Sequence, residues 1–381
     1  MRRTAKPVSL SSAAPATTAT PLTDTWSNTY LGVWCRRHRA KRRTTVSTIT
    51  ESHHDPAADQ ALEYARTLML LSEGSVHRHF DPFDDIDWDN PDFDVDAGPE
   101  RWTLPASGDP LGRHAWYRAL RPEQQIAIGK YRQANIAKVG LQFESLLISG
   151  MVQHTFGLPN GSPEFRYCSH EMIEEHNHTL MFQEMVNRIG IDVPGMGPLV
   201  RQVRHIVVPM AVLFPNLFFM AVLAGEEPID HIQKAILRSG DQVHPIMRGV
   251  MAIHVAEEAR HISFAHEFLE HHVPESNAVN KLVLSVAMPI VMRIAGRAIV
   301  TPPRSFFKEF DIPDHVRKEL FYGSDEAKQV FADYFVDVRA LAERIGLMNP
   351  VSKQVWKLLR IDGPTSRYRS EPLRKKVSGK S

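Results

Sequence analysis

The spacing of apolar side chains is helical almost throughout the chain beyond residue 57, and this periodicity is the strongest constraint on its fold. No stretch alternates between apolar and polar residues as a strand does, and no repeat of 20–50 residues is evident. The sequence therefore predicts an all-α fold, a four-helix bundle with additional peripheral helices. The long helices are expected at 121–156, 163–190, 198–239 and 241–272, and shorter ones at 56–74, 275–299, 314–322, 326–346 and 350–360.

Composition divides the chain into a central domain and two basic ends. Residues 1–55 are small, polar, basic and nearly free of acids, which predicts a disordered arm, with a transit peptide as the alternative. Residues 363–381 are predicted to form a flexible basic tail, and residues 56–362 one domain. Two cysteines, Cys35 and Cys168, give no disulfide framework, so we expect a cytoplasmic protein.

One apolar run could be mistaken for a membrane span. Residues 206–225 are 20 residues without a charge, long enough to cross a bilayer. Pro209, Pro215 and Asn216 interrupt the run, and two glutamates follow it directly. We interpret it as a core helix that breaks near its prolines, and we expect no membrane association.

Two of the expected long helices carry the same pair of metal-binding residue types. Glu175 and His178 form a Glu-x-x-His pair on one helix, and Glu258 and His261 form a second Glu-x-x-His pair on another. His254 precedes Glu258 by one helical turn, so it shares that face. Ionisable residues seldom occupy apolar helix faces without a function, and two such pairs on separate helices are typical of di-iron carboxylate bundles.

The other two long helices each offer a glutamate in an apolar setting. Glu144 lies within the apolar stripe of the first helix, where an uncompensated carboxylate would be costly. The third helix offers Glu226 and Glu227, of which Glu226 lies nearer the apolar face and Glu227 nearer the polar side. We predict Glu226 as the ligand and leave Glu227 as the alternative.

The resulting set balances the charge of two divalent ions. The predicted metal ligands are Glu144, Glu175, His178, Glu226, His254, Glu258 and His261. Four ionised glutamates cancel two ferrous ions, and mixed carboxylate and imidazole ligands suit iron, with manganese as an alternative. Glu175 and Glu258 are the natural bridging carboxylates.

These residues resemble the p-aminobenzoate N-oxygenase family of di-iron oxygenases. The resemblance covers roughly residues 60–300, and its distinctive part is His254 ahead of the last Glu-x-x-His pair. It implies a ferritin-like fold, a non-haem di-iron centre, and activation of O2 to oxygenate an amine or a related small substrate. Reaction at the nitrogen of an aryl amine is the activity that it favours.

Other parts of the machinery are expected to lie nearby or outside the chain. Leu147, Met151 and Phe182 are candidates for a water-excluding pocket, and Arg260 and His170 for partners that orient ligands, although Arg260 could equally face solvent. No nucleotide-binding loop or cysteine cluster is present, so electrons would come from a separate reductase. The net charge of +1 and the absence of a motif argue against nucleic-acid binding, and a homodimer is one option for the assembly.

Two other functions compete with an oxygenase. The chain could be an iron-handling bundle without an organic substrate, in which case an open polar channel should reach the metals. It could also be a purely structural bundle, in which case the carboxylates and histidines should lie on the surface. An enclosed apolar pocket beside buried ligands would favour the oxygenase.

Overall fold

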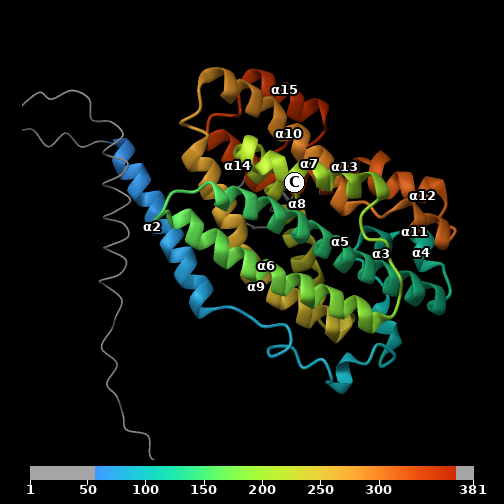
Figure 1. Cartoon of the computed structure of the whole chain (residues 1–381). Helices are drawn as coiled ribbons and strands as arrows, with labels where there is room; N and C mark the ends of the chain where they lie inside the picture. The colour runs from blue at the N-terminus through green and yellow to red at the C-terminus, as the bar shows by residue number, and fades with distance from the viewer. Residues whose placement is uncertain (1–55, 366–381) are drawn as a thin grey trace, which may run out of the picture. The chain divides into compact units, whose positions relative to one another are not determined.

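The computed structural model describes residues 56–365, and every regular element in this range is a helix. The predicted arm, residues 1–55, and residues 366–381 of the predicted tail lie outside this range, so the predicted domain boundaries stay predictions. The all-α prediction is confirmed, and the arrangement of the long helices is consistent with a ferritin-like bundle (Figure 1).

Four long helices form the centre of the fold: α5 (Pro122–Phe156), α6 (Pro163–Ile189), α8 (Pro215–Arg238) and α9 (Pro245–His272). The pairs α5–α6 and α8–α9 pack along their lengths, and contacts of α6 with α9 and of α5 with α8 close the bundle. Each helix starts with a proline, whose fixed φ suits the first helical position and whose missing N–H is not needed there. Gly190, at a φ of 72°, ends α6 as predicted.

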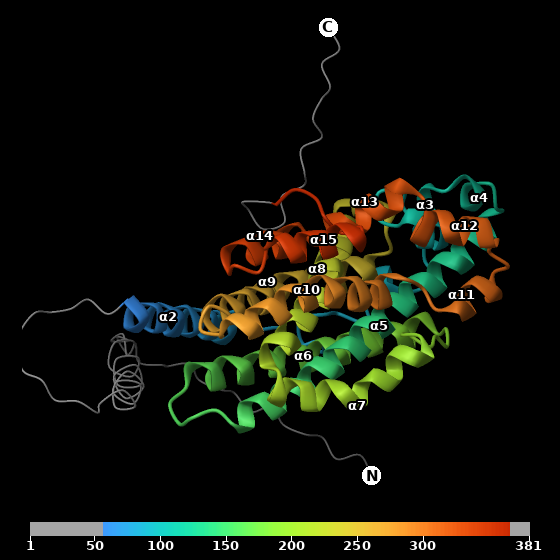
Figure 2. The same ribbon diagram turned by 90° about the horizontal axis from the view of Figure 1, so that it is seen from above.

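The remaining helices surround this bundle. Helix α2 (Pro56–His77) packs on α6 and α9, α7 (Pro198–Leu213) on α5 and α8, and α10 (Ala278–Val300) on α8 (Figure 2). The others are α3 (Pro110–Arg113), α4 (Ala115–Arg118), α11 (Arg304–Glu309), α12 (Asp314–Lys318), α13 (Asp325–Asp333), α14 (Val336–Arg344) and α15 (Pro350–Leu358). The single helix predicted at 326–346 is wrong, because the backbone leaves the helical region at Phe335 and separates α13 from α14.

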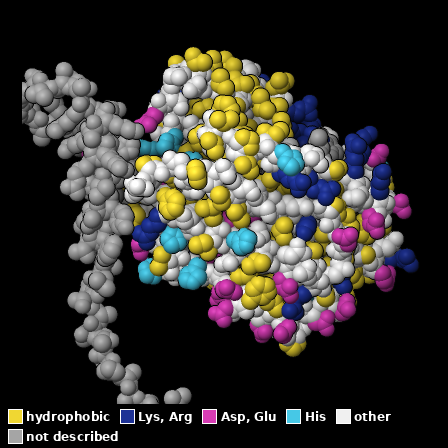
Figure 3. All heavy atoms as spheres, viewed as in Figure 1, with side chains coloured by type: hydrophobic (Ala, Val, Ile, Leu, Met, Phe, Trp, Pro, Cys, Tyr) yellow, Lys and Arg dark blue, Asp and Glu magenta, His cyan; other side chains and the backbone are white. Residues whose placement is uncertain are grey.

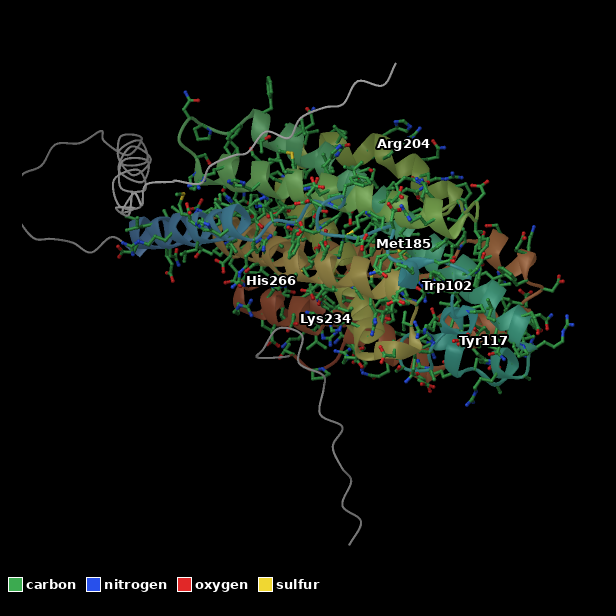
Figure 4. The ribbon with its side chains drawn as sticks, turned by 90° about the horizontal axis from the view of Figure 1, so that it is seen from below. Trp102, Tyr117, Met185, Arg204, Lys234 and His266 are labelled. Atoms are coloured by element: carbon green, nitrogen blue, oxygen red, sulfur yellow. The ribbon has the colours of Figure 1, made fainter. Side chains whose placement is uncertain are left out.

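The apolar run at 206–225 is a buried core helix only in its second half. It breaks at Phe214, whose φ of −140° and ψ of 62° lie outside the helical region, as expected for a residue that precedes a proline. Ile206 and Leu213 of α7 are 64% and 67% exposed, whereas Phe219 of α8 is fully buried. Figure 4 shows Arg204 of α7 at the outer edge of the molecule.

A different helical stretch has the length and composition of a membrane span. Among residues 56–365 it is Ala278–Glu309, with a third of its apolar window buried, and the sequence prediction overlooked it. Hydrophobic side chains gather on the face where α10 and α15 lie (Figure 3), among them Val279, Ile294 and Leu358. One such helix is weak evidence for a membrane, because core helices pass the same test.

A buried carboxylate ties four helices together at one end of the bundle. Glu164 Oε1 of α6 accepts hydrogen bonds from Tyr64 Oη of α2 and His272 Nε2 of α9, both at 2.9 Å. Its Oε2 lies 3.5 Å from His154 Nε2 of α5. Burial raises the pKa of Glu164, but the nearby His154 imidazole and the hydrogen bond with His272 outweigh it and hold the pKa well below its usual range. The charged form is therefore the one that stabilises the fold.

Glu164→Gln is expected to lower the free energy of unfolding by about 2–3 kcal/mol at pH 7, because a charge-assisted network loses its acceptor. Since the folded-state pKa is lowered, this stability is complete above the ordinary carboxyl pKa of 4.5 and declines as the pH falls below it. In urea unfolding, the difference in free energy of unfolding between wild type and variant should therefore decrease by roughly 1.4 kcal/mol between pH 5.5 and 3.5. A gap that stays constant over this range would mean that Glu164 is not ionised in the fold.

Candidate metal centre

Six of the seven predicted ligands meet inside the bundle, and each is at most 3% exposed. They form two groups, and within each group the ligand atoms lie within 4.8 Å of one another. The first group is Glu175, His178, Glu258 and His261, and the second is Glu144, His178 and His254. Because these side chains are buried, the prediction for a purely structural bundle, with the same residues on the surface, does not describe this chain.

Glu175 and Glu258 lie between the histidines. Glu175 Oε1 is 2.8 Å from His261 Nδ1, and its Oε2 is 3.3 Å from His178 Nδ1. Glu258 Oε2 is 3.4 Å from His261 Nδ1 and 3.6 Å from His254 Nε2, which itself lies 3.0 Å from Glu144 Oε1. Both carboxylates thus lie close to the imidazoles of two histidines each, and their role as bridging ligands stays a prediction.

Many of the polar atoms in this centre have no hydrogen-bond partner within residues 56–365. Even His261 Nδ1 and Glu175 Oε1, at 2.8 Å, do not have hydrogen-bond geometry. Each buried atom of this kind costs about 1–3 kcal/mol, and a set pointing at one place is what a cation would satisfy. The atoms are Glu144 Oε2, Glu175 Oε1, His254 Nδ1, His261 Nδ1 and both oxygens of Glu258.

The carboxylates of the centre differ in their protonation. Burial, together with the neighbouring Glu175 carboxylate, raises the pKa of Glu144 well above its usual value, and burial raises that of Glu258. Burial also acts to raise the pKa of Glu175, but His261 and His178 outweigh it and the pKa is lowered. Glu175 is therefore the most firmly ionised carboxylate of the three.

Two of the three histidines, His178 and His261, favour their positively charged form when no cation is bound. Burial acts to lower the pKa of His178, but hydrogen bonds to Glu175 and Glu257 raise it to about 10. The pKa of His261 is also raised, against burial, by the charge of Glu175 and by the hydrogen bond with Glu174. His254 differs, since burial and the nearby His178 lower its pKa. Metal binding would displace protons from His178 and His261, because a ligating imidazole must be neutral.

Two carboxylates that sequence reasoning missed lie within hydrogen-bond distance of the Nε2 atoms of the predicted ligand histidines. His178 Nε2 of α6 lies 2.9 Å from Glu257 Oε2 of α9, and His261 Nε2 of α9 lies 2.8 Å from Glu174 Oε2 of α6. Each helix thus supplies the carboxylate that orients the histidine of the other. The available signal was a repeated Glu-Glu-x-x-His motif at 174–178 and 257–261.

Arg260 completes this outer layer. Its Nη2 donates to Glu174 Oε1 at 2.8 Å and lies 3.5 Å from Glu257 Oε1, and its side chain is 13% exposed. The role predicted for it, orienting ligands, fits this position better than the solvent-facing alternative. His170, the other predicted partner, makes no hydrogen bond to a ligand within the described part of the chain.

The structure of α8 does not show whether Glu226 or Glu227 is the metal ligand. Glu226 and Glu227 are 2% and 1% exposed, and neither belongs to the two groups above. Glu226 Oε1 has no hydrogen-bond partner among residues 56–365, whereas Glu227 Oε1 lies 2.9 Å from His266 Nε2. Glu227 also forms a separate group with His231 and Asp337 that could hold an ion and was not predicted. The assignment of Glu226 as the seventh ligand stays a prediction.

A pocket adjoins the second group. It has a volume of about 500 Å³, with the space at its mouth included, and its lining is mostly apolar. Phe182 lines it and lies 5.0 Å from the His254 ring, centre to centre. Leu147 and Met151, predicted beside Phe182, instead belong to the buried core around Phe218.

The chain matches known proteins over most of its length. Residues 61–346 match the family model described as p-aminobenzoate N-oxygenase AurF. Two relatives, uncharacterised proteins of Mycobacterium bovis and Mycobacterium tuberculosis, are each 56% identical over 321 residues, which are 84% of this chain and 94% of theirs.

Proposed function

Because the chain belongs to the p-aminobenzoate N-oxygenase family, we propose that it is a non-haem di-iron oxygenase that uses O2 to oxygenate a small organic substrate. The proposed reaction is N-oxygenation of an aryl amine. The observation that carries the proposal is the convergence of buried carboxylate and imidazole atoms, many without hydrogen-bond partners, beside a mostly apolar pocket.

The residues of the chain have distinct tasks in this proposal. The seven predicted ligands hold two iron ions, which supply the redox chemistry for O2 when bound. Glu257 and Glu174 accept hydrogen bonds from the Nε2 atoms of His178 and His261, which leaves the Nδ1 lone pairs for the metal. The apolar pocket wall excludes water, and a separate reductase supplies electrons.

A second candidate is an iron-handling bundle, with iron or with manganese and iron, that has no organic substrate. The unassigned group of Glu227, His231 and Asp337 favours it, since it offers another place for an ion. The mostly apolar lining of the pocket favours the oxygenase, because ions cross a protein along polar groups.

Turnover distinguishes the two candidates. The full chain would be loaded anaerobically with ferrous iron, mixed with a panel of aryl amines and O2, and the organic products measured by mass spectrometry. We expect an amine that gains one oxygen or is converted to a nitro compound. Consumption of O2 with every amine recovered unchanged would support the iron-handling bundle instead.

Glu257→Gln is expected to weaken iron binding by about 10–100-fold, the usual effect of losing a carboxylate behind a ligating histidine. The amide no longer fixes the tautomer of His178 or compensates the charge of Arg260. Competition with a chelator would measure the affinity. Glu123→Gln, an exposed position on α5, is the matched control and should bind iron like the wild type. Equal affinities of the two variants would remove this role from Glu257.

A further inference from the structure

The pocket beside the candidate metal centre presents no uncompensated charge. Among its lining residues Arg132 is the only one with a charged side chain. Its Nε donates to Asp109 Oδ2 at 3.0 Å, and the two side chains are 6% and 5% exposed. A buried ion pair of this kind is already matched, so an incoming carboxylate would have to lose its hydration without a free cation to receive it.

One polar side chain of the pocket lining has an atom without a hydrogen-bond partner in the described part of the chain. Gln233 is 2% exposed, and its Oε1 has no hydrogen-bond partner among residues 56–365. A buried amide oxygen without a partner costs about 1–3 kcal/mol, and a hydrogen-bond donor on a bound molecule would recover this cost.

At its other end the same pocket approaches the predicted metal ligands, none of which is itself a lining residue. Met251 lines it one helical turn before His254, and Phe182 contacts the His254 ring. On α8, Glu226, Ile229 and Gln233 follow one another on one face, with Gln233 about 10 Å along the helix from Glu226. A molecule with its reacting group at the ligands therefore places its far end near Gln233.

We propose that the pocket takes an uncharged, largely apolar amine with a hydrogen-bond donor remote from the reacting nitrogen, and that Gln233 is the residue that selects this donor. The pocket discriminates against amines that carry a carboxylate at that end. This inference rests on the proposed oxygenase function, whose substrate class it specifies.

Binding, rather than turnover, tests the inference. Calorimetry on the full chain, loaded with ferrous iron and kept anaerobic, would compare 4-aminophenol, 4-methylaniline and 4-aminobenzoate. The ratio of the Kd of 4-methylaniline to that of 4-aminophenol should fall about tenfold in Gln233→Leu, the value of one hydrogen bond to a neutral group. The Kd of 4-aminobenzoate should be the highest of the three in the wild type.

A second variant should reverse the discrimination. Asp109→Asn frees the charge of Arg132, while asparagine can still cap α3 as Asp109 does by accepting from Leu111 N. We expect about tenfold tighter binding of 4-aminobenzoate and unchanged binding of 4-aminophenol. Circular dichroism would check that both variants are folded, and if Asp109→Asn is not, the Gln233→Leu ratio decides alone.

Three results would overturn the inference: tightest wild-type binding of 4-aminobenzoate, an unchanged ratio in Gln233→Leu, or no binding of any probe. The iron content of the same samples tests the proposed function separately. Two irons per chain with the wrong probe preference would reject only the substrate class. A chain without iron would reject the oxygenase itself.

Discussion

His178→Ala is expected to retain at most one iron ion per chain after anaerobic loading and desalting, against two for the wild type. His178 belongs to both groups of ligand atoms, so its loss removes a nitrogen ligand and breaks the contact between them. It also leaves the Glu257 carboxylate, 2.9 Å from His178 Nε2, without that partner. The iron content per chain would be measured by elemental mass spectrometry of the desalted protein.

His176→Ala is the matched control, since His176 lies two residues away on the same helix but is exposed. It should keep both ions, because an exposed imidazole on that face reaches neither group. Full iron content in His178→Ala, or equal loss in the two variants, would contradict the assignment.

Glu144→Gln is expected to have opposite effects on the metal-free and metal-loaded chain. Without metal, the wild type bears a buried carboxyl whose pKa is raised by burial and by the Glu175 carboxylate, so its charged form is penalised at pH 7. An amide of the same shape removes this penalty and should raise the free energy of unfolding by about 1–3 kcal/mol. With ferrous iron the order should reverse, because only the wild type keeps the ligand.

Urea unfolding at pH 7, with and without iron, measures both effects. The gain without metal should shrink as the pH falls toward 4.5, since the raised pKa lets the wild-type carboxyl take up a proton in the folded state first. This is the reverse of Glu164→Gln, in which the folded state favours the charge. A Glu144→Gln chain that is less stable than the wild type without metal would contradict the account of Glu144 as a strained ligand.

The sequence predicted the bundle well because its helices carry local signals. Pro122 in the first turn of α5 and Gly190 at the end of α6 specify these boundaries without tertiary information. The starts of α8 at Pro215 and of α9 at Pro245 were not predicted, because one helix was expected over 198–239 and the next from 241. Prediction from the sequence failed where the burial of a helix depends on the elements packed against it. The apolar side chains of α7 gave no sign that Ile206 and Leu213 would be exposed.

In the candidate site, too, features within one helix could be predicted and features that depend on two helices could not. Offsets of three and four residues place Glu258 and His261 on one face whatever surrounds the helix. The pairing of Glu174 with His261 and of Glu257 with His178 depends on how α6 and α9 lie against each other, which spacing within one helix does not specify.

Periodicity also could not choose between Glu226 and Glu227. Helix α8 is covered by α9 on one side and α10 on another, so both glutamates are buried and no polar face distinguishes them. The group of Glu227, His231 and Asp337 arises only because α14, far along the chain, supplies its third member.

Anomalous diffraction at the iron edge, from crystals of the chain loaded anaerobically with ferrous iron, tests the di-metal centre most directly. We expect two peaks per chain within the bundle, one touching Glu175, Glu258 and His261 and the other touching Glu144 and His254. His178, which belongs to both groups, and Glu226 or Glu227 should complete the ligands. No peak among these side chains, or iron held only at the surface, would contradict the di-metal centre.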